Sequence, residues 1–314
     1  MSRLLWTATA GAAALTGATL AGATLTAPGI EVDALRALVL LLVTATGAIA
    51  VAFSRRALRG EAYQQRFERL SAGLVVAGAA FATTTDLVVL AVAWVAVGAA
   101  AVALIGTGPD AGRQQRTARA RVAMGISDVA FVAAVAVLVA ASGGTSIAGI
   151  AAIEGAWATV AGLGIVAAAV ARAATMPLHR WLADSLAAPT PSSALLHAGV
   201  VNGGAVAAIV LAPVTSDAVV PALAAVAIGT ASCLAAEATM LTRPDVKGRL
   251  AWSTTAQMSF TLVLVGLGLH TAAVLHLVAH GLFKATLFLG SGGVVRRAAR
   301  AAQVARPAAA PRPP

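Results

Sequence analysis

The sequence predicts an all-α integral membrane protein with about ten transmembrane helices, for three reasons. Hydrophobic residues make up 59% of the 314 positions and charged residues only 11%, roughly half the charged share of a soluble domain. The apolar residues fall into runs of about 20, the length that a helix needs to cross a hydrocarbon core of about 30 Å. Lys and Arg gather in every second connection between these runs, as expected of a protein oriented by its basic loops.

Ten apolar runs define the expected spans. They cover about residues 4–27, 34–53, 68–84, 86–106, 122–142, 152–187 with a break, 192–213, 219–241, 250–268 and 272–294. Alanine and glycine dominate them, which favours close packing of helices in lipid. The first run also resembles a signal peptide, because Arg3 precedes a stretch of small apolar residues that ends near Ala27.

The connections that follow the even-numbered spans are basic. They contain Arg55, Arg56, Arg59, Arg66 and Arg69, then Arg113, Arg116, Arg119 and Arg121, then Arg243, Lys247 and Arg249, and finally Arg296, Arg297 and Arg300. The opposite connections, at 28–33, 142–146 and 215–217 and around His270, contain no Lys or Arg. We therefore expect a multi-pass protein of the plasma membrane with both termini in the cytoplasm.

Three regions follow from this pattern. Residues 1–53 form the N-terminal transmembrane helices, residues 54–295 form the main membrane domain, and residues 296–314 form a basic Pro/Ala-rich tail that we expect to be disordered. Membrane lipid is the expected surrounding of the first two regions, and the tail is expected to lie on the membrane surface.

Several function classes lack the residues that they need. The net charge of +10 comes from loop and tail arginines, without a basic stripe and interleaved aromatics, so nucleic acid is not an expected partner. The single cysteine, Cys233, excludes a disulfide framework and a Cys-based metal site. The sequence has no HExxH motif and no P-loop, and GLGIVA at 162–167 lacks the strand that a dinucleotide site requires. We expect neither an enzyme nor a cofactor.

His276, His280 and Lys284 follow one another at intervals of four residues. This spacing puts all three on one helix face, over about 12 Å of rise. Histidine changes charge near neutral pH, and ionisable residues inside a span are functional candidates by default. The column is typical of a proton relay. The alternative is a polar seam that binds neighbouring helices and conducts nothing.

A broken helix is predicted after Arg172. Pro177 removes a backbone donor and clashes with the preceding turn, and freed carbonyls beside a buried cation are a feature of ion sites in transporters. The alternative is a span that ends near Ala174 and continues as an interfacial helix anchored by Trp181.

Four more ionisable residues lie in or beside the predicted spans. His197 enters the span after the break, and Glu237 is either a counter-ion or a group near a helix end. Asp128 lies near the cytoplasmic mouth of its span, where we favour a solvated role over a conducting one. Lys247 is either part of the path or a side chain that extends to the lipid headgroups.

Three segments, met in order, resemble a known family. They are RAATMPLHRWLADSLAAPTPSSALLHAGVVN at 172–202, DVKGRLAWSTTAQMSF at 245–260 and HLVAHGLFKATLFLGSGGV at 276–294. They resemble the signatures of the antiporter-like membrane subunits found in respiratory complex I, in Mrp cation/proton antiporters and in DabB inorganic-carbon transporters. With weaker similarity upstream, the resemblance covers about residues 50–295.

The family implies a proton-conducting fold of inverted five-helix repeats, each with a broken helix, linked by a buried polar axis. By motif position, Arg172 stands where the family usually has a buried lysine, His197 where it has a bridging histidine, and Lys247 where it has the lysine before the LAWST stretch. His276, His280 and Lys284 match the family's polar helix. The resemblance also implies that the second repeat is incomplete here.

Two departures from the complex I pattern matter for the mechanism, and the first of them, together with the wording HAGVVN and AWSTTAQM, favours the DabB type. Complex I subunits have a glutamate directly after the tryptophan of an earlier signature, whereas Val95 follows Trp94 here. Arginine stays protonated in proteins, so we interpret Arg172 as a fixed electrostatic gate. The resemblance then implies an ion-conducting, non-enzymatic subunit that drives inorganic-carbon uptake by a large zinc-containing DabA-like partner. The alternatives are a subunit of a quinone oxidoreductase or an Mrp-like antiporter, and a non-conducting scaffold subunit.

Overall fold

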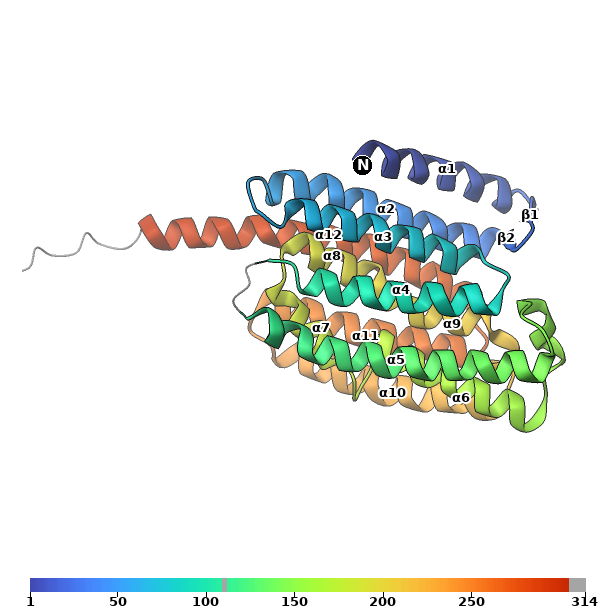
Figure 1. Cartoon of the computed structure of the whole chain (residues 1–314). Coiled ribbons are helices and arrows are strands. Elements are labelled where there is room, and N and C mark those ends of the chain that lie inside the picture. The colour runs from blue at the N-terminus through green and yellow to red at the C-terminus, as the bar shows by residue number, and fades with distance from the viewer. Residues whose placement is uncertain (109–111, 305–314) are drawn as a thin grey trace, which may run out of the picture.

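The computed structural model describes residues 1–108 and 112–304, with side chains described as far as Ser291 in the last helix. These residues form a bundle of long helices with one short β-hairpin at one end (Figure 1). The elements are α1 (Ser2–Leu20), β1 (Leu25–Ala27), β2 (Ile30–Val32), α2 (Ala34–Ala57), α3 (Gln64–Thr83), α4 (Leu87–Ile105), α5 (Arg113–Ser142), η1 (Ile147–Ala152), α6 (Gly155–Arg172), α7 (Arg180–Asp184), η2 (Ser185–Ala187), α8 (Thr190–Ala198), η3 (Val200–Asn202), α9 (Gly203–Val210), η4 (Ala212–Val214), α10 (Val219–Thr242), α11 (Val246–Gly266) and α12 (His270–Val304).

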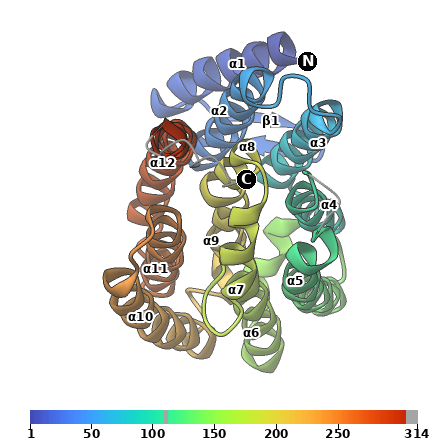
Figure 2. The ribbon, with the colours of Figure 1, turned by 90° about the vertical axis from the view of Figure 1, so that its left-hand side faces the viewer.

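The segment α8–η3–α9 runs through the centre of the bundle. Viewed along the helices, it is surrounded by α2 to α6 on one side and α10 to α12 on the other (Figure 2). In its most apolar stretch 83% of the residues are buried, against 28% in the peripheral α10. A helix that is covered on all sides can hold polar groups away from lipid. The central segment is therefore the natural place for an internal polar path.

Seven stretches among the described residues are long and apolar enough to cross a membrane: α2, α4, α5, α6, the α8–α9 segment, α10 and residues 270–291 of α12. Helices also occupy the other three expected spans, but α1, α3 and α11 do not reach that apolarity. Arg66, Glu68 and Arg69 lie near the start of α3, and Lys247 and Arg249 near the start of α11. The expected count of about ten spans is not confirmed.

Several boundaries differ from the expected ones. The first helix ends at Leu20, and the residues after it form the β-hairpin, whose turn contains Pro28 and Gly29 with φ +73° at Gly29. Proline followed by a glycine with positive φ suits a tight turn. Within the expected span 192–213 the helix is interrupted at Gly199, between α8 and η3. At the C-terminal end of the chain, α12 continues as a helix to Val304, although the sequence predicts a disordered tail from residue 296. Residues 305–314 lie outside the described residues.

Helix α4 begins at Leu87 because Asp86 caps it. The Asp86 carboxylate accepts hydrogen bonds from the backbone N–H groups of Val88 and Val89 and from the Thr145 hydroxyl. These bonds satisfy donors that a helix start leaves free. They also lower the pKa of the Asp86 carboxyl, with the Thr145 bond as the largest cause.

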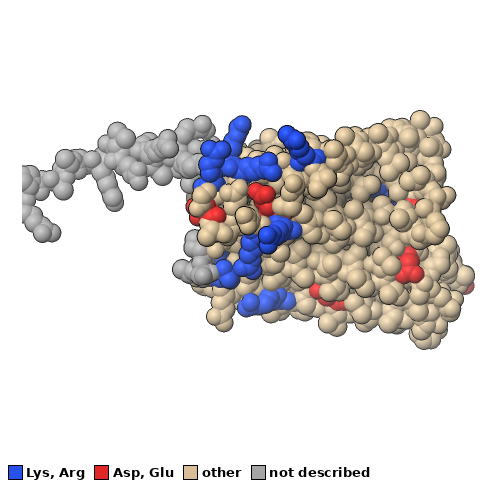
Figure 3. All heavy atoms as spheres, turned by 45° about the horizontal axis from the view of Figure 1, so that its top comes forward, with Lys and Arg blue, Asp and Glu red and all other residues tan. Residues whose placement is uncertain are grey.

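The two ends of the bundle differ in charge. Lys and Arg gather at the end where α2 ends and α3 and α5 begin, whereas the visible part of the other end is mostly uncharged and most of its few charged residues are Asp or Glu (Figure 3). Arg36 is an exception at that other end. It is 8% exposed, lies 4.0 Å from Glu31 and 3.9 Å from Asp33, and donates a hydrogen bond to the Thr84 carbonyl. This asymmetry is the one that orients membrane proteins.

Candidate ion pathway

Close approach of α6 and α12 to the central segment builds the polar interior. A Cβ at Gly204 of α9 would lie 2.7 Å from the Ala169 carbonyl oxygen of α6. A Cβ at Gly281 of α12 would lie 2.9 Å from the Ala198 carbonyl oxygen of α8. Such approaches leave room only for glycine. They bring the C-terminal end of α6, near Ala169, and the polar face of α12 against the central segment.

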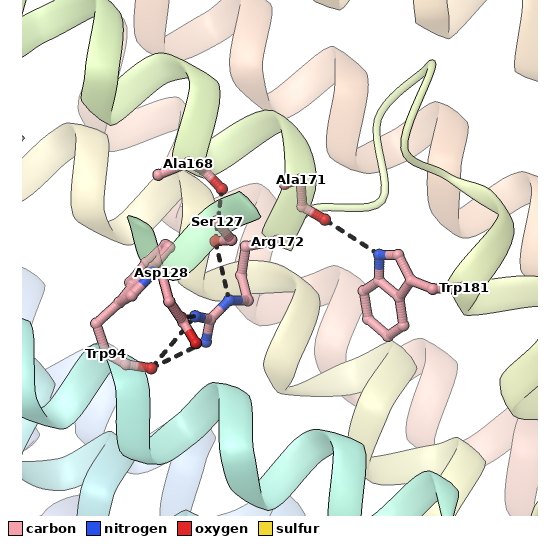
Figure 4. Close-up of polar contacts among 7 residues, drawn as sticks. All are labelled: Trp94, Ser127, Asp128, Ala168, Ala171, Arg172 and Trp181. Atoms are coloured by element: carbon pink, nitrogen blue, oxygen red, sulfur yellow. Dashed lines mark hydrogen bonds and ion pairs between the residues drawn. The ribbon is translucent and has the colours of Figure 1, made fainter. Parts of the chain in front are cut away.

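Arg172, the last residue of α6, forms the first polar cluster (Figure 4). Its side chain is fully buried, and one terminal nitrogen lies 2.6 Å from the Asp128 carboxylate of α5. Both terminal nitrogens donate to the Trp94 carbonyl at 3.2 Å, and the guanidinium lies 4.1 Å from the centroid of the Trp94 ring. Its Nε donates to the Ser127 hydroxyl at 3.4 Å. We call Trp94, Ser127, Asp128 and Arg172 the arginine cluster.

The arginine cluster corrects our interpretation of Asp128. We favoured a solvated role for this residue, but the structure pairs it with the buried guanidinium. A buried charge without a partner costs free energy, and α4 contains no Asp or Glu that could pair with Arg172. Val95, which follows Trp94 on α4, is 37% exposed and lines an outer groove between α4 and α5. Gly98, one turn after Trp94, leaves the space: a Cβ there would lie 3.0 Å from Arg172 and 3.1 Å from Asp128. The counter-charge therefore comes from the neighbouring helix.

A second polar cluster surrounds His197 in the last turn of α8. This imidazole is fully buried, with Nδ1 3.2 Å from the Thr254 hydroxyl of α11 and Nε2 3.4 Å from the Ser185 hydroxyl of η2. The Phe288 ring of α12 lies against it, with the ring centroids 4.2 Å apart. The backbone carbonyl of His197 accepts a hydrogen bond from His280 Nε2 at 3.1 Å.

His280 and Lys284 extend this cluster along α12. His280, 3% exposed, has Nδ1 2.5 Å from Oε1 of Gln257 on α11. Lys284, fully buried, donates to the Ser253 hydroxyl at 2.8 Å and to the Leu250 carbonyl at 3.2 Å. We call His197, His280, Lys284 and their polar partners on α11 (Ser253, Thr254 and Gln257) the histidine–lysine cluster.

The remaining predicted residues lie at its edge. His276 is half-buried, its ring is 6.1 Å from that of His280, and its Nε2 has no hydrogen-bond partner among the described residues. Glu237 of α10 is partly exposed and its charge reaches Lys284, although no ion pair within 4 Å joins them among the described residues. Lys247 is partly exposed in the first turn of α11, with no hydrogen bond or ion pair in the described part of the chain. Pro177 lies in the irregular segment between α6 and α7.

The two clusters are not joined to each other. Within residues 1–108 and 112–291, no side-chain hydrogen bond links Arg172 to His197. The buried Asn202 of η3 has its side-chain carbonyl oxygen unpaired and lines a cavity of about 60 Å³, otherwise almost wholly apolar, between α2, α3 and the central segment. Unpaired buried oxygens are typical positions for bound water.

Sequence reasoning missed the neutral partners. Ser253, Thr254 and Gln257 belong to the run STTAQ inside an apolar helix, and such a concentration of hydrogen-bonding side chains is a signal in itself, because lipid offers them no partner. Ser127 and Ser185 had no comparable signal. The described residues also contain no group of three or more His, Cys, Asp or Glu that could hold a metal ion.

Polytopic helices around two separate buried clusters, one built on Arg172 and one on His197, His280 and Lys284, define the class: a membrane subunit of the transporter kind. Residues 84–307 match the model of the NADH:quinone oxidoreductase/Mrp antiporter transmembrane family. Because this match covers more than half of the chain, the protein belongs to that family.

Three relatives give the range of similarity. The chain is 36% identical over 284 residues to the probable inorganic carbon transporter subunit DabB1 of Halothiobacillus neapolitanus, covering 86% of this chain and 50% of the relative. It is 30% identical to NADH-quinone oxidoreductase subunit L of Mycobacterium tuberculosis, covering 85% and 43%. The Mrp complex structure from Dietzia sp. DQ12-45-1b matches with a TM-score of 0.76 and 27% identity, covering 88% and 33%. The chain thus spans half or less of the length of these relatives.

Proposed function

We propose that this chain conducts protons across the plasma membrane and thereby energises inorganic-carbon uptake by a large DabA-like partner subunit. The observation that carries the proposal is the histidine–lysine cluster. Its two imidazoles and one ammonium are buried on two helices, α8 and α12, and are held by hydroxyl, amide and carbonyl groups. Histidine and buried lysine can both gain and lose a proton, so these groups suit transfer better than they suit structure alone.

The carbon-uptake part of the proposal rests on similarity. Relatives from several bacteria are described as probable inorganic carbon transporter subunits. The zinc chemistry would belong to the partner, whose zinc site is implied by the resemblance.

The arginine cluster has a different proposed role. A guanidinium stays charged, and here it is held by Asp128 and the Trp94 carbonyl. We assign it to a fixed positive gate that sets the field at the end of α6 rather than to a proton carrier. Residues 54–295 would form the conducting domain, and the basic end of the bundle would face the cytoplasm.

Complementation tests the proposal. A host that lacks carbonic anhydrase receives the chain together with a DabA-like partner, and growth in air is measured. We expect growth with the wild-type chain and loss of growth with Lys284→Met at equal membrane abundance. The matched control is Thr286→Val, since Thr286 lies two residues further on α12, is exposed, and donates only to its own helix. Failure of the wild-type pair to support growth contradicts the proposal.

The carried ion is tested in the same cells. Proton conduction predicts that growth persists when sodium is replaced by choline and is lost when a protonophore collapses the pH gradient. The opposite pattern assigns the path to sodium.

A second candidate is a subunit that couples ion movement to electron transfer, favoured by the similarity to subunit L. Co-purification with iron–sulfur or flavin subunits supports it. An Mrp-like cation/proton antiporter is the related alternative, favoured by the Mrp structure. The lack of a hydrogen-bonded link between the two clusters favours a third candidate, a non-conducting scaffold; unchanged gradient-dependent uptake in Lys284→Ala supports that one.

A further inference from the structure

Gln257 occupies a position between two titratable side chains. Its Oε1 is 2.5 Å from His280 Nδ1, and its Nε2 donates to the Ser253 hydroxyl at 3.4 Å. The same hydroxyl accepts from Lys284 Nζ at 2.8 Å. One carboxamide and one hydroxyl therefore connect the His280 imidazole to the Lys284 ammonium through side chains of α11.

The other nitrogen of His280 is fixed. Nε2 lies 3.1 Å from the His197 carbonyl oxygen, and a carbonyl can only accept, so Nε2 carries a hydrogen whether the ring is neutral or charged. The charge of the ring is then decided at Nδ1 alone. An imidazolium has a hydrogen on Nδ1 and needs an acceptor there, whereas the neutral ring has a lone pair and needs a donor.

A carboxamide meets both needs by turning over. With Oε1 toward Nδ1, as in the structure, Gln257 accepts from an imidazolium and its amino group donates to Ser253. With the amide rotated by half a turn, the amino group donates to the neutral ring, and Oε1 accepts from the Ser253 hydroxyl. Each orientation suits one charge state of His280.

The orientation of the Gln257 amide also changes how well the Ser253 hydroxyl can accept a hydrogen bond from Lys284. Beside an imidazolium, the Ser253 oxygen accepts from both Gln257 and Lys284. Beside a neutral His280, Ser253 donates to Gln257 and keeps its lone pairs for the ammonium. The ammonium is therefore held best when His280 is neutral, the same direction as the direct repulsion of two positive charges.

We propose that Gln257 is a two-position positioning residue that couples the charge states of His280 and Lys284, so that a proton arriving at one loosens the proton held by the other. The charged and titratable groups around the pair are His276 on α12, His197 on α8 and Glu237, whose charge reaches Lys284 from α10. The use of this coupling in transport rests on the proposed function, but the coupling itself does not.

Nitrogen NMR of the 314-residue chain in lipid bilayers tests the coupling. The sequence contains two lysines, Lys247 and Lys284, and five histidines, so ¹⁵N labelling of these types gives few signals. Lys247, which lies outside the cluster, is the internal reference. His280→Asn identifies the His280 signals by their loss. In the wild type we expect the Lys284 Nζ signal to change with the same midpoint as His280 Nδ1.

Three variants separate the steps. Gln257→Glu can only accept at Nδ1, so the His280 midpoint is expected to rise by about 1 to 3 pH units, as for a carboxylate in contact with a cation. Gln257→Leu removes both hydrogen bonds and is expected to reduce the Lys284 response to the small through-space effect. Ser253→Ala keeps the Gln257–His280 contact, so His280 should still titrate while the Lys284 response falls to the same small through-space effect.

Two results overturn the inference: an unchanged His280 midpoint in Gln257→Glu, or a Lys284 response of wild-type size in both Gln257→Leu and Ser253→Ala. Because these spectra need no transport, they are independent of the growth assay. Growth of Lys284→Met like wild type removes the proposed function and leaves the coupling standing.

Discussion

The arginine cluster and the histidine–lysine cluster differ in the partners that stabilise their buried positive groups. Both put positive groups inside a membrane bundle, but Arg172 has a carboxylate at 2.6 Å and a carbonyl on the same guanidinium, whereas His197, His280 and Lys284 have only neutral direct partners. A permanently charged guanidinium paired with a carboxylate forms a fixed dipole that does not exchange protons. Groups held by hydroxyls and amides can gain or lose a proton without leaving a buried carboxylate unpaired.

Asp128→Ala gives the largest expected effect on stability. It leaves the fully buried guanidinium without its counter-charge, and breaking a buried ion pair from one side costs about 3 to 5 kcal/mol. Unfolding of the purified chain in increasing denaturing detergent measures the loss.

The matched control for this prediction is Asp184→Ala. Asp184 pairs with Arg119 at 2.9 Å, but the Arg119 side chain is 57% exposed, so its loss should cost at most about 1 kcal/mol. The double variant Asp128→Leu, Arg172→Met should recover most of the stability, because neither charge remains. Equal losses in the two single variants contradict the contrast drawn here.

His197→Ala is expected to cost less, about 1 to 3 kcal/mol. It removes a neutral hydrogen-bonding ring and leaves the Thr254 and Ser185 hydroxyls without that partner. The same detergent unfolding measures it, and Ser185→Ala separates the loss of one hydrogen bond from the loss of the ring. A cost above that of Asp128→Ala would show that His197 is mainly structural.

Asp86→Ala gives a smaller expected effect than His197→Ala, about 0.5 to 2 kcal/mol for a lost helix cap, and lies outside both clusters. The lowered pKa of this carboxyl means that the folded state favours its ionised form. Its contribution is therefore present above the pKa of the unfolded chain and is lost as the pH falls through the lower, folded value. Unfolding measured from neutral to acid pH should show the difference between wild type and variant shrinking; a constant difference contradicts the capping role.

The sequence predicted the membrane class and the family because run length, loop charge and motif order are local properties of the chain. His280 and Lys284 were also predictable, since spacing alone puts them on one helix face. The pairing of Asp128 with Arg172 was not, because 44 residues separate them and only the approach of α5 to α6 brings them together. Gln257 and Ser253 were overlooked although the STTAQ run marks a polar helix face, because the titratable groups that they contact come from another helix.

One hydrogen bond in the histidine–lysine cluster involves the main chain: the His197 carbonyl accepts from His280 Nε2. Every amino acid offers that same oxygen, so replacing the ring at 197 deletes the imidazole while this anchor for His280 persists. A saturation library at position 197 thus tests the ring alone. Removing the anchor requires moving the backbone of α8, for example by enlarging Gly281, whose bare Cα keeps α12 close enough for the contact.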